Sequence, residues 1–214
     1  MIYLLSPLKK EGTTSLPMIT FTIVSEVIDF SQCDTLMFTS KQAVVSAERI
    51  DVAWKNYPCL AIGAATKKKI EELGGRVVYS PKDFYGEVLA KDIQKYFSDR
   101  KLLYLRPKEV SFNSKAYLER HNIVLEEQII YETSCVTYTI EKEPITNAVI
   151  IFTSPSTIKC FFKNFNWSES YTAVLIGTAT KEHLPKKCKF VVADKPLITS
   201  CIKKAKEVEE NRKK

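Results

Sequence analysis

The chain has 214 residues, of which 45% are hydrophobic and 27% are charged, an ordinary composition for a soluble globular protein. No run of about 18 apolar residues occurs, which excludes a predicted membrane-spanning helix. The formal net charge of +7 favours an anionic partner, either nucleic acid or a small polyanion.

The N-terminal segment 1–7 has a short apolar run and no basic residues before it, so it predicts a strand and no signal peptide. The protein is therefore expected to be cytoplasmic. The cysteines show no Cys-x-x-Cys pair and the two histidines have no partner at zinc spacing, so no metal site is predicted. In the cytoplasm we expect reduced and mostly buried thiols. The cysteines are Cys33, Cys59, Cys135, Cys160, Cys188 and Cys201.

Short apolar runs alternate with amphipathic patterns along residues 35–107, which is typical of a doubly wound parallel α/β sheet. The predicted strands are 35–38, 59–62, 76–79 and 101–105, and the predicted helices are 41–49, 67–73 and 86–97. Gly74 and Gly75 end the second of these helices, because glycine favours the conformation found just after a helix.

The same pattern returns 114 residues later. Between Phe38 and Val78, eleven of 41 ungapped positions are identical to residues 152–192. Such self-similarity over a long period indicates one supersecondary unit used twice. The predicted elements of the second repeat are 148–152, 155–162, 173–176, 181–184, 190–192 and 197–208.

The second repeat ends without a fourth strand, whereas residues 2–7 resemble the fourth strand of the first repeat at 103–107. We therefore predict two similar doubly wound lobes, one of them discontinuous, joined by a two-stranded linker, with a cleft between the lobes. The expected boundaries are 1–20 plus 138–214 for the discontinuous lobe, 26–132 for the inserted lobe, and 20–25 and 131–139 for the linker strands.

Polar side chains recur just after the strands of both repeats, where open α/β sheets bind ligands and helix N-termini favour anions. Thr39-Ser40 and Thr153-Ser154 are one such pair of segments, and 64–66 and 178–180 are the other. The alternative is ordinary helix capping by serine and threonine. Gly63 and Gly177 allow either a close backbone approach or a tight turn. No nucleophile–base pair is visible, which indicates a site that works by hydrogen bonding and positioning.

These motifs together resemble the uroporphyrinogen-III synthase family over nearly the whole chain. The matching segments, specific in their order and spacing, are 38–44, 61–66, 103–107, 124–133, 152–156 and 176–180. The resemblance implies two α/β lobes joined by a two-stranded linker. It also implies a lyase that converts hydroxymethylbilane, a linear tetrapyrrole with eight carboxylates, into uroporphyrinogen III. That reaction loses the terminal hydroxyl, inverts the last ring and closes the macrocycle, with no cofactor or metal.

The resemblance implies Tyr131 as proton donor to the leaving hydroxyl; the alternative is an aromatic side chain packed at the linker. It also implies that Thr66 and Thr180 line the cleft. It implies a small-molecule substrate, and we expect a monomer with the preceding bilane-forming enzyme as a candidate partner. From the loops and motifs together, the residues expected to bind substrate are Thr39, Ser40, Lys41, Gly63, Ala64, Ala65, Thr66, Arg106, Thr153, Ser154, Ser156, Gly177, Thr178 and Thr180.

The chain departs from the family after its first strand, where Leu5-Ser6-Pro7 replaces a usual Thr-Arg-Pro and only residues 9–16 stand in place of a helix. Lys9 or Lys10 could replace the missing arginine. Two other interpretations stay open. One is a non-catalytic two-lobed binding or sensor protein for a small polyanion. The other is a nucleic-acid-binding protein, which is disfavoured because the lysines are spread along the chain without a clustered basic face.

Overall fold

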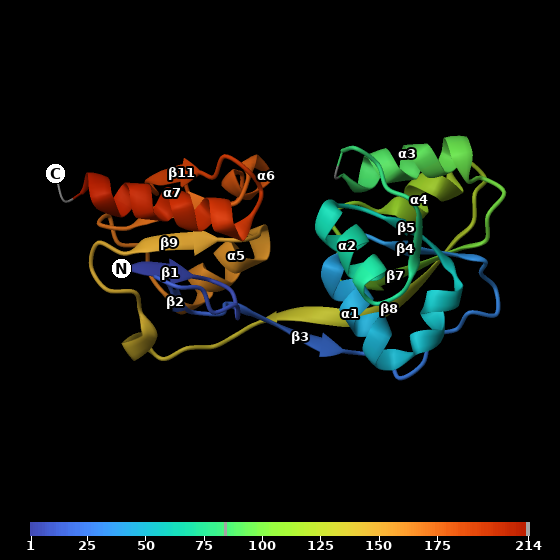
Figure 1. Cartoon of the computed structure of the whole chain (residues 1–214), viewed down its shortest axis with the longest axis horizontal. Helices are drawn as coiled ribbons and strands as arrows, with labels where there is room; N and C mark the ends of the chain where they lie inside the picture. Colours follow the sequence, from blue (N-terminus) through green and yellow to red (C-terminus); the bar gives the residue numbers. More distant parts are fainter. Residues whose placement is uncertain (84, 213–214) are drawn as a thin grey trace. The chain divides into compact units, whose positions relative to one another are not determined.

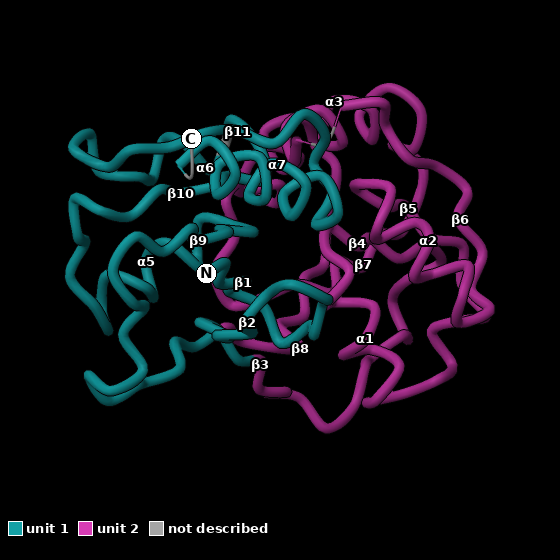
Figure 2. The backbone as a smooth tube through the Cα atoms, turned by 60° about the vertical axis from the view of Figure 1, so that its left-hand side comes forward, with its two compact units in different colours: residues 1–20, 134–214 teal, residues 21–133 magenta. Residues whose placement is uncertain are grey.

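The computed structural model describes residues 1–83 and 85–212. The chain forms two compact units: unit 1 contains Met1–Thr20 and Ser134–Lys214, and unit 2 contains Phe21–Thr133 (Figure 2). It passes between them twice, once within strand β3 (Ile19–Ile23) and once within strand β8 (Leu125–Cys135). Unit 1 is therefore discontinuous in sequence, and unit 2 is one continuous insertion.

Unit 2 contains a six-stranded sheet in the order β3-β8-β7-β4-β5-β6 (Figure 1). The pairings from β8 through β6 are parallel, and Leu36 of β4 lies between Leu103 and Cys59 on the two neighbouring strands. The central strands are buried apolar runs, as parallel strands covered on both faces require. The remaining bounds are β4 (Thr35–Phe38), β5 (Pro58–Ala61), β6 (Arg76–Tyr79) and β7 (Leu102–Pro107).

Helices cover both faces of this sheet, which gives unit 2 two cores. One core joins Leu36 and Phe38 to α1 (Lys41–Ile50), α2 (Ala64–Glu72) and the short 3-10 helix η1 (Val52–Asn56). The other joins Met37 and Leu60 to α3 (Gly86–Tyr96) and α4 (Ser114–Glu119). Consecutive strand residues alternate between the two cores, because side chains along a strand point to opposite faces.

Unit 1 contains a five-stranded parallel sheet in the order β11-β10-β9-β1-β2. The N-terminal strand β1 (Ile2–Leu4) lies between β2 (Thr14–Ser15) and β9 (Val149–Phe152), with Tyr3 beside Ile150. The sheet continues through β10 (Thr172–Leu175) to β11 (Phe190–Val192). The N-terminal strand thus occupies the place that β7 occupies in unit 2, beside the equivalent of β4.

Helices also cover both faces of the unit 1 sheet. Helix α5 (Pro155–Asn164) packs on the core that contains Tyr3 and Phe152. Helix α7 (Ile198–Asn211) packs on the opposite core, which contains Leu4 and Ile151. The two remaining helices are short: η2 (Ile140–Lys142) and α6 (Thr178–Lys181). Among the described residues, no helix is both long and apolar enough to cross a membrane.

Two helices begin earlier than the sequence predicts. α2 starts at Ala64 and α6 at Thr178, so 64–66 and 178–180 form first helical turns and are not loops. Gly63 allows this start in unit 2, because its φ of 85° turns the chain directly from β5 into the helix. α6 ends at Lys181, whereas a helix was expected over 181–184. Residues 9–16 form no helix, and Thr14–Ser15 extends the sheet as β2.

The expectation of six reduced thiols is wrong for two of the cysteines. Cys135, the last residue of β8, forms a disulfide with Cys160 of α5, with their Cα atoms 5.2 Å apart. Sequence alone does not pair them, because they lie 25 residues apart and become neighbours only when α5 packs beside the end of β8. The other four thiols are free, and three of these are buried.

Candidate functional site

In unit 2, two hydroxyl groups follow β4 at the carboxyl edge of the sheet. Oγ1 of Thr39 lies 2.6 Å from the hydroxyl of Tyr104 on β7, and Oγ of Ser40 lies 2.9 Å from the hydroxyl of Tyr131 on β8. Ser40 also caps α1, because its Oγ accepts a hydrogen bond from the backbone N–H of Ala43 at 3.0 Å. Capping and site interactions therefore coexist at Ser40, and one does not exclude the other.

Tyr131 is held from three sides. Its side chain is 4% exposed, its hydroxyl bonds to Ser40, and its ring meets the edge of Phe21 at a centroid distance of 5.8 Å. Burial raises the pKa of the Tyr131 hydroxyl above its ordinary value, and the Ser40 hydrogen bond opposes this in part. The hydroxyl is therefore protonated at neutral pH, as a proton donor must be, and its orientation is fixed by its neighbours.

Tyr104 lies beside these hydroxyl groups but is not among the residues expected from the sequence. It is 3% exposed, and burial raises the pKa of its hydroxyl to about 12 despite the opposing hydrogen bond with Thr39. The signal that could have found it is its position two residues before Arg106 on the strand beside β4. With Tyr131 it forms a pair of buried, protonated aromatic hydroxyls at one sheet edge.

The two cations expected to bind substrate in unit 2 differ in how they are engaged. Nε of Arg106 lies 3.2 Å from a Glu127 carboxylate oxygen without the alignment of a hydrogen bond, and its Nη1 donates to the backbone oxygens of Pro107 and Lys108. Lys41 is exposed at the first position of α1. Lys41 is thus accessible to a ligand, whereas Arg106 already has an acidic partner within the protein.

The start of α2 leaves open space around a backbone turn. A Cβ added at Gly63 would meet no atom within 4 Å, and Ala64 and Ala65 after it are exposed. Thr66, by contrast, is 4% exposed, and its N–H donates to the carbonyl of Gly63. Small side chains beside the N-terminus of a nine-residue helix leave backbone N–H groups accessible, an arrangement that suits a carboxylate.

Unit 1 places the equivalent residues after β9 in a tighter arrangement. Ser154 and Thr157 form a capping box, in which each side chain accepts a hydrogen bond from the other residue's backbone N–H. Ser156 is exposed on the first turn of α5. Leu4 stands where unit 2 has Tyr104, so Thr153 meets no tyrosine hydroxyl there. Capping thus accounts for Ser154 more completely than for Ser40.

The second loop of unit 1 precedes the short helix α6. Gly177 is extended, with φ of −174°, so the backbone does not require glycine there, and a Cβ would meet no atom within 4 Å. Thr178 is exposed, whereas Thr180 is 3% exposed and its N–H donates to the carbonyl of Gly177. The repeated threonines at 66 and 180 are therefore both buried, and each donates its N–H back to a glycine.

No cluster of three or more metal-ligating side chains occurs within residues 1–83 and 85–212.

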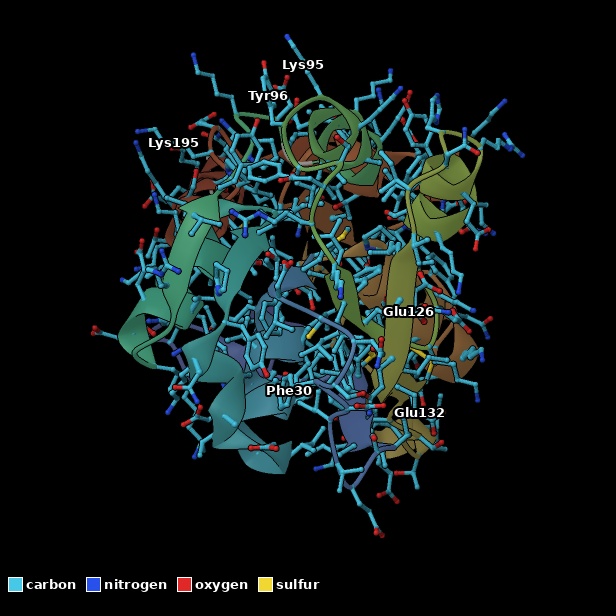
Figure 3. The ribbon with its side chains drawn as sticks, turned by 90° about the vertical axis from the view of Figure 1, so that its right-hand side faces the viewer. Phe30, Lys95, Tyr96, Glu126, Glu132 and Lys195 are labelled. Carbon is cyan, nitrogen blue, oxygen red and sulfur yellow. A yellow bond between two sulfur atoms is a disulfide. The ribbon has the colours of Figure 1, made fainter. Side chains whose placement is uncertain are left out.

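A pocket of about 390 Å³ lies at the opposite edge of the unit 2 sheet, at the amino end of β7, and is lined by Lys101, Leu102 and Glu126 among others. Figure 3 shows Glu126 and Glu132 spaced along β8. Ligands of open α/β sheets bind at the carboxyl edge, so we do not assign this pocket to the site.

The family model described as "Uroporphyrinogen-III synthase HemD" matches residues 9–203. The chain belongs to the uroporphyrinogen-III synthase family. Its activity is accordingly that of a lyase of tetrapyrrole and haem biosynthesis, which converts hydroxymethylbilane to uroporphyrinogen III with inversion of the last ring, loss of water and closure of the macrocycle. A non-catalytic binding protein is not favoured.

Solved structures agree with this family. The chain is 25% identical to uroporphyrinogen-III synthetase from Helicobacter pylori, with a TM-score of 0.80 over 97% of this chain and 98% of that one. A mutant uroporphyrinogen III synthase from the extremely thermophilic bacterium Thermus thermophilus is 12% identical, with a TM-score of 0.61 over 98% of each chain, and supports the fold. No curated protein sequence matches the chain significantly.

Proposed function

We propose that this enzyme works by positioning its substrate with hydroxyl and backbone N–H donors, and that Tyr131 donates a proton to the leaving hydroxyl. The observation that supports the role of Tyr131 is its buried, protonated hydroxyl, held by Ser40 at the carboxyl edge of the sheet. Proton donation to a leaving group is typically worth about 10²–10⁴ in rate, and holding a flexible chain in one geometry contributes comparable or larger factors.

Several of the other expected site residues bind carboxylates in this proposal. The N-terminus of α2, with Ala64 and Ala65 exposed, and the exposed Lys41 offer an N–H cluster and a cation to an anion. In unit 1 the exposed Ser156 and Thr178 offer hydroxyls. Arg106 acts indirectly, because its ion pair with Glu127 links β7, which carries Tyr104, to β8.

An isomer assay tests the proposed function. The protein is incubated with freshly made hydroxymethylbilane, and the uroporphyrin I and III isomers are separated after oxidation. The free bilane closes without inversion, so an excess of isomer III requires catalysis. Raised salt and Lys41→Gln should both raise KM, because both weaken the attraction between exposed cations and carboxylates. Production of isomer I alone would overturn the proposed function.

We also propose that the enzyme acts as a monomer in the cytoplasm and receives its substrate from the bilane-forming enzyme. Spontaneous closure of the bilane supports a short path between the two enzymes. Light scattering after size exclusion tests the monomer, and cell fractionation tests the compartment. Mixing the two enzymes tests transfer: the fraction of isomer III should exceed that obtained when an equal amount of bilane is added from solution.

A further inference from the structure

Unit 1 has a groove of about 440 Å³ between α5 and the segment that follows α6. α5 begins just beyond the carboxyl end of β9, and α6 begins just beyond the carboxyl end of β10. The groove therefore starts at the sheet edge that carries the Thr153 and Thr178 segments. None of the expected substrate-binding residues lines it.

The apolar part of the groove is suited to a flat ring. Pro155, Ile158 and Phe162 lie on one face of α5, at the spacing that aligns side chains along a helix, and Pro185 lies on the other wall. The half-buried ring of Phe162 is fixed in place, because its centroid lies 5.6 Å from that of Phe161 and 6.1 Å from that of Trp167. A fixed ring surface costs little conformational entropy when a ligand packs on it.

The rim of the groove is cationic. The exposed Lys159 and Lys163 carry this charge, and His183 also lines the groove. α5 contains no acidic residue, and residues 181–189 contain four lysines and one glutamate. Within the part of the chain that the structure describes, neither Lys159 nor Lys163 pairs with a carboxylate. Both lysines belong to α5, and the segment after α6 contributes His183 and Pro185 to the groove.

We propose that this groove is a subsite for one pyrrole ring of the bilane, with Phe162 against the ring face and Lys159 and Lys163 on its carboxylate side chains. The subsite rests on the proposed function. The two lysines are four residues apart on one helix, so their stems begin about 6 Å apart. That spacing matches two carboxylates attached to the same ring. An oligonucleotide would instead need a longer basic track for its successive phosphates.

The test compares two double variants. Lys159→Gln/Lys163→Gln removes both cations of the groove, and Lys203→Gln/Lys206→Gln removes two exposed lysines of α7 as a matched control. We expect the groove variant to raise KM for hydroxymethylbilane by roughly 3- to 10-fold with little change in kcat, since each exposed ion contact contributes modestly. The control should leave KM unchanged.

A binding measurement tests the subsite without relying on catalytic turnover. Fluorescence titration with uroporphyrin III, the oxidised product, should show a similar fold loss of affinity in the groove variant, and Phe162→Ala should weaken binding further. Isomer III formation with unchanged KM and unchanged uroporphyrin affinity in the groove variant would overturn the subsite alone. The protein could instead bind a short DNA duplex more tightly than uroporphyrin III. If the groove variant lost that DNA binding, the groove would be assigned to nucleic acid. A wild-type protein that forms only isomer I would overturn the function and the subsite together.

Discussion

The two units repeat the same succession of strand, loop and helix, but the hydroxyl groups at their sheet edges have different partners. In unit 2, Thr39 and Ser40 reach tyrosine hydroxyls on two neighbouring strands. In unit 1, Ser154 is used in a capping box, and Leu4 occupies the position of Tyr104. The succession of elements is thus repeated, while Leu4 in place of Tyr104 leaves Thr153 without the tyrosine partner that Thr39 has.

The cationic side chains of the two units also differ in whether they have acidic partners. Unit 2 pairs Arg106 with Glu127 beside its hydroxyl network, whereas unit 1 leaves Lys159 and Lys163 unpaired among its described residues. A paired arginine stabilises its own protein, and an unpaired exposed lysine is accessible to an anion. The two proposals together assign proton donation to unit 2 and additional carboxylate binding to unit 1.

The largest expected effect on stability comes from reducing the disulfide, which should destabilise one unit and not the other. Reduction of Cys135–Cys160 should lower the free energy of unfolding of unit 1 by about 3 kcal/mol, the usual effect of a loop of this size, and leave unit 2 unaffected. Each unit contains one tryptophan, so Trp54→Phe leaves Trp167 to report on unit 1, and Trp167→Phe leaves Trp54 to report on unit 2. Denaturant unfolding of each variant with and without dithiothreitol gives the loss of unfolding free energy in each unit.

A Cys135→Ser/Cys160→Ser variant provides the control, because dithiothreitol should not change its unfolding. An equal loss in both units would mean that the disulfide does not act locally.

The largest expected effect on rate concerns the Tyr131 hydroxyl, which is hydrogen-bonded to Ser40 in unit 2. Tyr131→Phe should reduce kcat by roughly 10²-fold, the lower end for loss of a proton donor, because positioning by the other donors remains. The product should still be isomer III, and KM should change little. The measurement is steady-state turnover with isomer separation. Full activity would remove the hydroxyl from the mechanism and leave the ring as packing against Phe21.

The buried Tyr104 should make unit 2 sensitive to alkaline pH. Its pKa is about 12 in the folded protein and about 10 when unfolded, so only the unfolded state loses the proton between these values. The stabilisation is complete below pH 10 and is lost as the pH rises toward 12, by at most about 2.7 kcal/mol. Denaturant unfolding at pH 9 and pH 11, followed through Trp54, should show a smaller loss for Tyr104→Phe than for the wild type. An equal loss of unfolding free energy between pH 9 and pH 11 in the two proteins would show that Tyr104 does not cause the alkaline sensitivity.

The smallest expected effects concern the repeated threonines. Thr66→Ala in unit 2 and Thr180→Ala in unit 1 should each lower kcat/KM by less than about tenfold, because the backbone N–H donors beside them remain. Circular dichroism would verify the fold of each variant before turnover is measured. Complete loss of activity in either well-folded variant would contradict a site built from many shared donors.

The sequence by itself determined the repeat, the alternation of strands and helices, and the strand edge at which polar residues gather. These features depend on local patterns: apolar runs such as 149–152 predict buried strands, and Gly74, with φ of 89°, ends α2 as expected. The family resemblance likewise depends on short motifs kept in order, and the family model confirms it. Helix starts were less predictable, because Gly63 begins α2 three residues before its amphipathic pattern is visible.

Only the tertiary structure decided which distant groups meet. Thr39 and Tyr104 are 65 residues apart, Ser40 and Tyr131 are 91 apart, and each pair depends on the lateral order and register of parallel strands. The Cys135–Cys160 disulfide and the two walls of the unit 1 groove arise in the same way, from α5 packing beside other segments, although both lysines of the groove belong to α5 itself. Periodicity specifies which face of an element is buried, but not which element lies beside it, because many neighbours satisfy the same apolar pattern.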